Sequence, residues 1–164
     1  MPDRLYDVLF LCTGNSARSI MAEAVMNKRG RGRFRAHSAG SHPTGKVNPH
    51  ALAALQAAGI PTEGLRSKSW DEFAAPGAPA MDFIFTVCDK AAAEQCPIWP
   101  GHPTSAHWGI EDPAAFVGPE EKVQARFKAV LSHLTRRVEL LLSLKPESLD
   151  QTSLRSELAR IGRS

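Results

Sequence analysis

The stretch LFLCTGNSARS, residues 9–19, sets Cys12 and Arg18 around five small or short polar residues. The backbone N–H groups of such a loop could converge on one tetrahedral oxyanion, and the dipole of a following helix would add positive charge. In that field we expect a lowered pKa for Cys12, which gives a thiolate nucleophile near neutral pH. Arg18 would bind two oxygens of the oxyanion through a pair of hydrogen bonds. The predicted oxyanion-binding residues are Thr13, Gly14, Asn15, Ser16, Ala17, Arg18 and Ser19.

The elements around this loop are typical of an α/β fold with a parallel sheet. Apolar or alternating runs predict strands at 5–11, 33–40, 81–87 and 105–108. Helices are predicted at 19–30 with a cap at Ser19, at 48–59 with Asn48 as cap and Pro49 at the first helical position, and at 69–75 and 123–142. Ligands bind at the carboxyl ends of parallel strands, which is where the loop lies. The structural alternative is a buried cysteine in a strand-to-helix turn, with Arg18 exposed on the helix.

Bulk properties predict one globular domain: 164 residues, 43% hydrophobic, with a net charge of +3. The only basic run is Arg29, Arg31, Arg33 and Arg35, which we interpret as a solvated loop and not as a nucleic-acid site. No stretch has the length of a membrane span, and three cysteines, an odd number, suit a reducing compartment. We therefore expect a soluble, cytoplasmic protein.

The motif Cys-x5-Arg-Ser between a strand and a helix resembles the low-molecular-weight protein tyrosine phosphatase superfamily. SAG at 38–40, VCDKAAAEQCP at 87–97 and HWGIEDP at 107–113 are similar to its thioredoxin-coupled arsenate reductase branch. The resemblance implies a three-layer fold, with a four-stranded parallel sheet and helices on both faces, and a role in arsenic detoxification. It covers a predicted domain at 1–144, followed by a tail at 145–164 with a short helix over 153–162.

The number of cysteines separates two reactions. A phosphatase transfers no net electrons, whereas reducing arsenate takes two, which a dithiol supplies as it becomes a disulfide. The resemblance implies that Cys12 attacks arsenate, that Cys88 attacks Cys12 and releases arsenite, and that Cys96 then attacks Cys88. Thioredoxin, or glutaredoxin with glutathione, would be the external dithiol reductant. Seven residues separate Cys88 from Cys96; a regular helix would hold them about 12 Å apart, so this segment must rearrange.

The expected general acid is Asp112, which precedes a stiffening proline and would protonate the departing oxygen. Glu111 is the weaker candidate, and a helix-cap role is the structural alternative for Asp112. The rival function is a tyrosine phosphatase that uses Cys12, Arg18 and Asp112. Ala114 after the Asp-Pro pair and Ala17, where these phosphatases commonly carry a second cysteine, favour the reductase.

The same residues, with nearby histidines and acids, offer alternative ligand sites. Zinc held by Cys88, Cys96, His102 and His107 fits poorly, because their spacings exceed those of structural zinc sites. A non-catalytic oxyanion-binding module would leave the later cysteines without a role. Some related reductases hold potassium, for which the resemblance implies Asn15, Glu23, Ser38 and Asp71; the alternative is that these residues brace the loop or are solvated. We expect no tightly bound cofactor, and phosphate or sulfate as mimics of arsenate. The remaining histidines, at positions 37, 42, 50 and 133, are expected to lie at the surface or to support the site from behind, and not to be catalysts.

Overall fold

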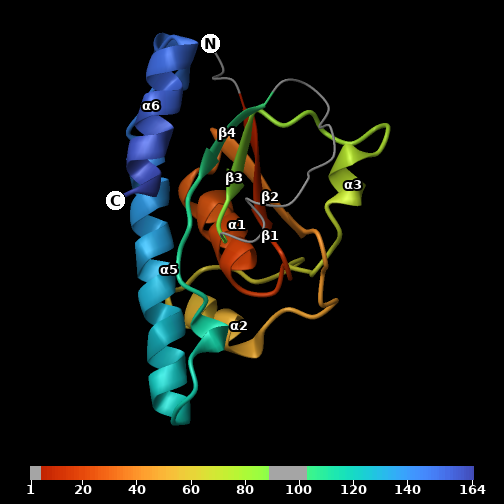
Figure 1. Cartoon of the computed structure of the whole chain (residues 1–164), viewed down its shortest axis with the longest axis vertical. Coiled ribbons are helices and arrows are strands. Elements are labelled where there is room, and N and C mark those ends of the chain that lie inside the picture. The colour runs from red at the N-terminus through yellow and green to blue at the C-terminus, as the bar shows by residue number, and fades with distance from the viewer. Residues whose placement is uncertain (1–4, 89–102) are drawn as a thin grey trace.

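The computed structural model describes residues 5–88 and 103–164 (Figure 1). Its centre is a parallel four-stranded sheet in the order β2-β1-β3-β4. The strands are β1 (Tyr6–Cys12), β2 (Phe34–Gly40), β3 (Phe83–Thr86) and β4 (Thr104–His107). All seven residues of β1 are buried, as its nearly continuous apolar run predicts for a strand covered on both faces.

Helices cover both faces of the sheet within the described residues, as expected. Figure 1 shows α5 and α6 along one side of the sheet and the short α3 on the opposite side. Alternate side chains of β1 account for this: Val8 and Phe10 join the larger core, while Leu9 and Leu11 pack with Phe73 of α3. The helices are α1 (Arg18–Arg29), α2 (Pro49–Ala57), α3 (Asp71–Ala74), α5 (Glu120–Leu142) and α6 (Gln151–Gly162), with 3-10 turns at Pro113–Ala115 (η1) and Pro146–Ser148 (η2).

The ends of the first two helices test the expected caps. Asn48 caps α2 as predicted: its Oδ1 accepts the His50 N–H at 2.8 Å, and Pro49 occupies the first turn. The expected cap at Ser19 is wrong. Helix α1 begins one residue earlier, and the Ser19 hydroxyl instead accepts a hydrogen bond from Asn15 at 2.8 Å. The side chain is drawn into the loop because Asn15 supplies a donor there.

The C-terminal segment completes the larger core. Helix α6 forms where a short helix was expected, and its Leu154, Leu158 and Ile161 are buried. The Trp108 indole N–H, just after β4, donates to the carbonyl of Leu158 at 2.9 Å. Gly162 lies against β4 so closely that a Cβ there would be 2.4 Å from the carbonyl oxygen of His107. The tail therefore packs on the sheet as part of the same body.

Arg29, Arg31 and Arg35 of the basic run are exposed, as expected for a solvated stretch, while Arg33 is half-buried. Arg33 donates to the carbonyls of Leu142 (2.8 Å) and Leu144 (3.1 Å) at the C-terminal end of α5, where a cation also complements the helix dipole. Arg35 pairs with Asp7 at 2.7 Å. Arg33 thus connects the loop before β2 to the end of α5, and Arg35 connects β2 to β1. Separately, no helix in the described ranges combines the length and apolarity needed to cross a bilayer.

We predict that Leu158→Ala destabilises the whole protein, by about 2–5 kcal/mol, because it opens a cavity in the core that α6 shares with the sheet. Urea unfolding followed by circular dichroism measures the change. Arg155→Ala, an exposed position of the same helix, is the control and should be near neutral. A tail that merely rested on the surface would instead show a similar, small loss for both variants.

Candidate active site

The loop after β1 is held with its carbonyl groups turned outward. The carbonyls of Thr13, Gly14 and Ser16 accept hydrogen bonds of 2.8–3.0 Å from backbone N–H groups in the segment 42–48. The Ser67 hydroxyl adds a fourth bond, to the Gly14 carbonyl, at 3.2 Å. Because each peptide unit is planar and trans, a carbonyl that points outward turns the following N–H inward. The loop therefore directs backbone donors at its own centre, as an anion-binding concavity requires.

Asn15 fixes the turn in this loop. Its φ is +46°, in the left-handed region that asparagine tolerates better than most residues. The buried side chain donates to the hydroxyls of Ser19 (2.8 Å) and Ser38 (3.0 Å), and its Oδ1 accepts the backbone N–H of Lys68 at 2.9 Å. One local bond and two long-range bonds thus select one conformation of the loop.

Gly40, the last residue of β2, makes room for the loop. A Cβ at this position would lie 2.4 Å from the carbonyl oxygen of Thr13 and 2.9 Å from that of Cys12, both backbone atoms that cannot move aside. Cys12 is the register partner of Gly40 in the sheet. The SAG motif therefore has a steric explanation: only glycine lets the loop cross the end of β2.

The loop borders a cavity of about 550 Å³ at the carboxyl end of the sheet. The cavity is lined by Cys12, Thr13, Gly14, Ser16, Ala17, Arg18, Thr44, Cys88, Ile110, Glu111, Asp112 and Ala114. Four of the five predicted catalytic residues therefore meet at one cavity. The fifth, Cys96, lies in 89–102, outside the described residues. Sequence reasoning missed Thr44 and Ile110, because neither residue type carries a signal and only the fold brings them to the loop.

Cys12 and Cys88 meet because their strands are neighbours. Leu11 of β1 is the register partner of Thr86 of β3, so the two cysteines follow at the same edge of the sheet. Both are buried thiols, and they are close enough to share a hydrogen bond. The Thr13 hydroxyl also lies 3.5 Å from the Cys88 sulfur. A second thiol thus stands beside the candidate nucleophile.

The expected lowering of the Cys12 pKa is wrong, because the structure raises it. The hydrogen bond with the Cys88 thiol, then burial, and then repulsion from a Cys88 thiolate raise the pKa of Cys12; the Arg18 charge and the Asn15 N–H lower it less. Two adjacent thiols titrate as a pair, and the second proton is held tightly because its loss would place two negative charges together. The loop sequence could not reveal this, since Cys88 comes from another strand.

Arg18 and Asp112 face each other across the cavity. The Arg18 guanidinium donates to the Ile110 carbonyl at 3.1 Å and lies 3.7 Å from the Asp112 carboxylate. The side chain of Arg18 is 15% exposed and that of Asp112 is 42% exposed, so the carboxyl group stands at the mouth. Asp112 also caps η1 by accepting the Ala114 N–H at 3.0 Å, so the structural role and the placement at the cavity occur together.

The weaker acid candidate and the zinc alternative have other partners. The Glu111 carboxylate accepts a hydrogen bond from Arg126 at 2.8 Å. The His107 ring shares a hydrogen bond of 2.8 Å with the Thr86 hydroxyl. Cys96 and His102 lie outside the described residues, and no group of three or more metal-binding side chains occurs among those that are described.

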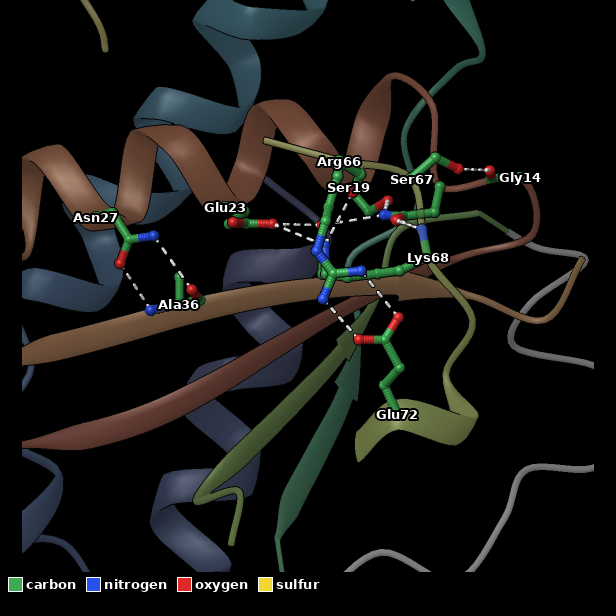
Figure 2. A network of polar contacts seen from close by, with 11 residues as sticks. Gly14, Ser19, Glu23, Asn27, Ala36, Arg66, Ser67, Lys68 and Glu72 are labelled. Carbon is green, nitrogen blue, oxygen red and sulfur yellow. Dashed lines mark hydrogen bonds and ion pairs between the residues drawn. The ribbon is translucent and has the colours of Figure 1, made fainter. Parts of the chain in front are cut away.

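Three of the residues expected around potassium, Asn15, Glu23 and Ser38, form a network with Lys68. Figure 2 shows Lys68 and Glu23 in this network. Glu23 and Ser38 are hydrogen-bonded to each other, and Lys68 Nζ lies near both. The side chain of Asp71 is exposed, while its backbone N–H donates to Ser69 Oγ at 3.1 Å. Lys68 was not among the predicted site residues, because a lone lysine in a loop gives no sequence signal.

A parallel sheet that ends in an oxyanion-directed loop with Cys12 and Arg18 defines a cysteine-dependent, phosphatase-like class of protein. Residues 7–156 match the low molecular weight phosphotyrosine protein phosphatase family, and the chain belongs to that family. It is also similar to an arsenate reductase of Bacillus licheniformis, at 37% identity over 80% of this chain and 91% of the relative.

Solved structures agree with this placement. An arsenate reductase from Archaeoglobus fulgidus superimposes with a TM-score of 0.65 at 29% identity, covering 84% of this chain and 99% of that one. A low molecular weight protein tyrosine phosphatase from T. tengcongensis has a TM-score of 0.65 at 24% identity, with 84% and 97% covered. The second likeness concerns the fold alone.

We predict that Cys88→Ala lowers the pKa of Cys12, because it removes the hydrogen bond and the charge that raise it. Both proteins should carry Cys96→Ala, so that no third thiol titrates. The pH dependence of Cys12 carboxymethylation, read by peptide mass spectrometry, gives the midpoint. It should move to lower pH in the variant; an unchanged or higher midpoint would show that Cys88 does not control Cys12.

Proposed function

We propose that this protein reduces arsenate to arsenite through a covalent Cys12 adduct and a Cys12/Cys88/Cys96 disulfide relay. The observation that carries the proposal is the Cys88 thiol beside Cys12, in the cavity that also holds Arg18 and Asp112. A phosphatase has no use for that second thiol, whereas a two-electron reduction requires one. Similarity to arsenate reductases over most of the chain supports the same reaction.

In the first step, the inward backbone N–H groups and Arg18 hold the oxyanion. Arg18 exchanges its contact with the Ile110 carbonyl for two oxyanion oxygens. Cys12 transfers its proton to the bound oxyanion, and its sulfur attacks arsenic. One oxygen leaves as water after accepting a proton from Asp112. The adduct has an S–As bond, and arsenic is still in the +5 state.

The second step carries the electrons. The Cys88 thiolate attacks the Cys12 sulfur, the S–As bond breaks, and its electron pair stays on arsenic, which leaves as arsenite in the +3 state. The two sulfurs are oxidised to a disulfide. Cys96 then attacks Cys88, which transfers the disulfide to Cys88–Cys96 and frees Cys12. An external reductant, thioredoxin or glutaredoxin with glutathione, reduces the Cys88–Cys96 disulfide and is itself oxidised.

We place this cycle in the cytoplasm, because the reductants that it requires are kept reduced there. Phosphate and sulfate share the tetrahedral shape and charge of arsenate, so both should compete for the loop. No tightly bound cofactor is needed, since the electrons come from thiols.

A phosphomonoesterase is the second candidate function, and the family match favours it. Cys12 as nucleophile, Arg18 as oxyanion ligand and Asp112 as acid would suffice for it. This reaction needs neither Cys88 nor Cys96, and that independence separates the two candidates experimentally.

We predict that the intact protein forms arsenite with a thioredoxin system, with glutaredoxin and glutathione, or with both. Cys88→Ser and Cys96→Ser should each abolish turnover, because each removes one electron-carrying thiol, whereas neither should prevent the initial Cys12 adduct. Arsenite production is measured directly. Full turnover by either variant would overturn the relay, and aryl-phosphate hydrolysis that survives both, without arsenate reduction, would establish the phosphatase.

We predict that Asp112→Asn slows adduct formation by about 10²–10⁴-fold, the usual contribution of a positioned general acid. A single turnover with excess enzyme, quenched and analysed for the Cys12 adduct, isolates this step. Glu111→Gln is the matched comparison, and its loss should be much smaller, because Arg126 already holds that carboxylate. Equal losses for the two variants, or a larger loss for Glu111→Gln, would show that Asp112 is not the general acid.

A further inference from the structure

Lys68 places a buried ammonium group behind the oxyanion loop. The residue is 8% exposed, and its Nζ lies 3.0 Å from the carbonyl oxygen of Arg66, 3.4 Å from Ser38 Oγ and 3.6 Å from Glu23 Oε1. These three oxygens match the three N–H donors of an ammonium group. Figure 2 shows Lys68 reaching toward Glu23 of α1, across the end of β2.

The ammonium is linked to the loop through Asn15. Ser38 Oγ accepts from both Lys68 Nζ (3.4 Å) and Asn15 Nδ2 (3.0 Å), and it donates to Glu23 at 2.5 Å. The backbone N–H of Lys68 donates to Asn15 Oδ1 at 2.9 Å. Lys68 therefore holds both ends of the Asn15 amide, directly at the oxygen and through Ser38 at the nitrogen.

Glu23 makes a positive charge necessary at this point. Its side chain is 14% exposed, and a carboxylate so far from water is costly unless a cation lies near it. Burial lowers the pKa of Lys68, while the Glu23 charge opposes that effect. The nearby Arg66 guanidinium is turned to the surface, where it pairs with both oxygens of Glu72 at 3.0 and 2.6 Å. Lys68 is the cation that directly faces Glu23 and Ser38.

A potassium ion does not fit this arrangement. The oxygens of Glu23 and Ser38 already contact the lysine ammonium, Asn15 Oδ1 accepts a backbone N–H, and Asp71 is exposed. An ammonium group and a potassium ion carry the same charge and are similar in size. One therefore excludes the other from the space among these oxygens.

We propose that Lys68 is a positioning residue whose ammonium takes the place of a monovalent cation behind the oxyanion loop, so that the loop needs no dissolved potassium. The inference rests on the proposed oxyanion-binding role of the loop, but not on arsenate reduction. Removing the side chain while keeping Glu23 and Ser38 should create a cation site that the wild-type protein lacks. That consequence distinguishes a replaced cation from a lysine that only packs.

The test is phosphate affinity, measured by calorimetry with the full chain in sodium and in potassium buffers. Wild-type affinity should be the same in both. Lys68→Ala should bind phosphate about 10–100-fold more weakly in sodium, the range seen when a partner that orients a site residue is lost, and potassium should restore most of the loss. Potassium should also raise the Tm of this variant, and not that of the wild type.

Two further variants control the result. Lys68→Met fills the space without a charge and should lose affinity without recovery in potassium, whereas Lys128→Ala, an exposed lysine of α5, should behave as the wild type. The inference is overturned if wild-type affinity depends on potassium, if Lys68→Ala binds normally in sodium, or if no monovalent cation reverses its loss. If Lys68→Ala is too unstable to bind, an equal Tm in the two buffers overturns it.

Phosphate binding requires no turnover, so the outcome is independent of the proposed reaction. A protein that binds phosphate as described but forms no arsenite would contradict the proposed function and leave the role of Lys68 intact. Arsenite formation with potassium-dependent wild-type binding would do the reverse.

Discussion

The outward direction of three carbonyl groups in the loop after β1 is the constraint on which the site depends. Backbone N–H groups in the segment 42–48 donate to these carbonyls, so the planar peptides of the loop turn their own N–H groups inward. Gly40 lets the loop cross the end of β2, and Asn15 is the residue of the loop with a left-handed backbone conformation. The proposed anion-binding surface is thus built from main chain, before any charged side chain contributes.

Charge is then supplied from two sides. Arg18 lines the cavity, while Lys68 lies on the other side of the loop and pairs with the half-buried Glu23. These two cations have different tasks, because one can exchange its carbonyl partner for an oxyanion and the other is enclosed by protein oxygens.

The position of Cys88 changes the chemistry of Cys12. A thiol in such a loop alone would ionise readily, but the hydrogen bond with Cys88 and burial raise the pKa of Cys12. In the proposed mechanism the bound oxyanion therefore accepts the Cys12 proton. The strand order β2-β1-β3 is what produces this contact, since it makes β1 and β3 neighbours.

The sequence by itself determined the parallel α/β fold, the loop from Cys12 to Arg18 and most of the candidate site, because apolar periodicity and short motifs are local properties. Asn48 at the start of α2 and the buried face of α6 were predictable for the same reason. Only the tertiary structure decided the raised pKa of Cys12, the outward carbonyls and the place of Lys68. Each depends on groups from separate segments of the chain, and their distances are set by strand order and loop packing, which no local pattern encodes.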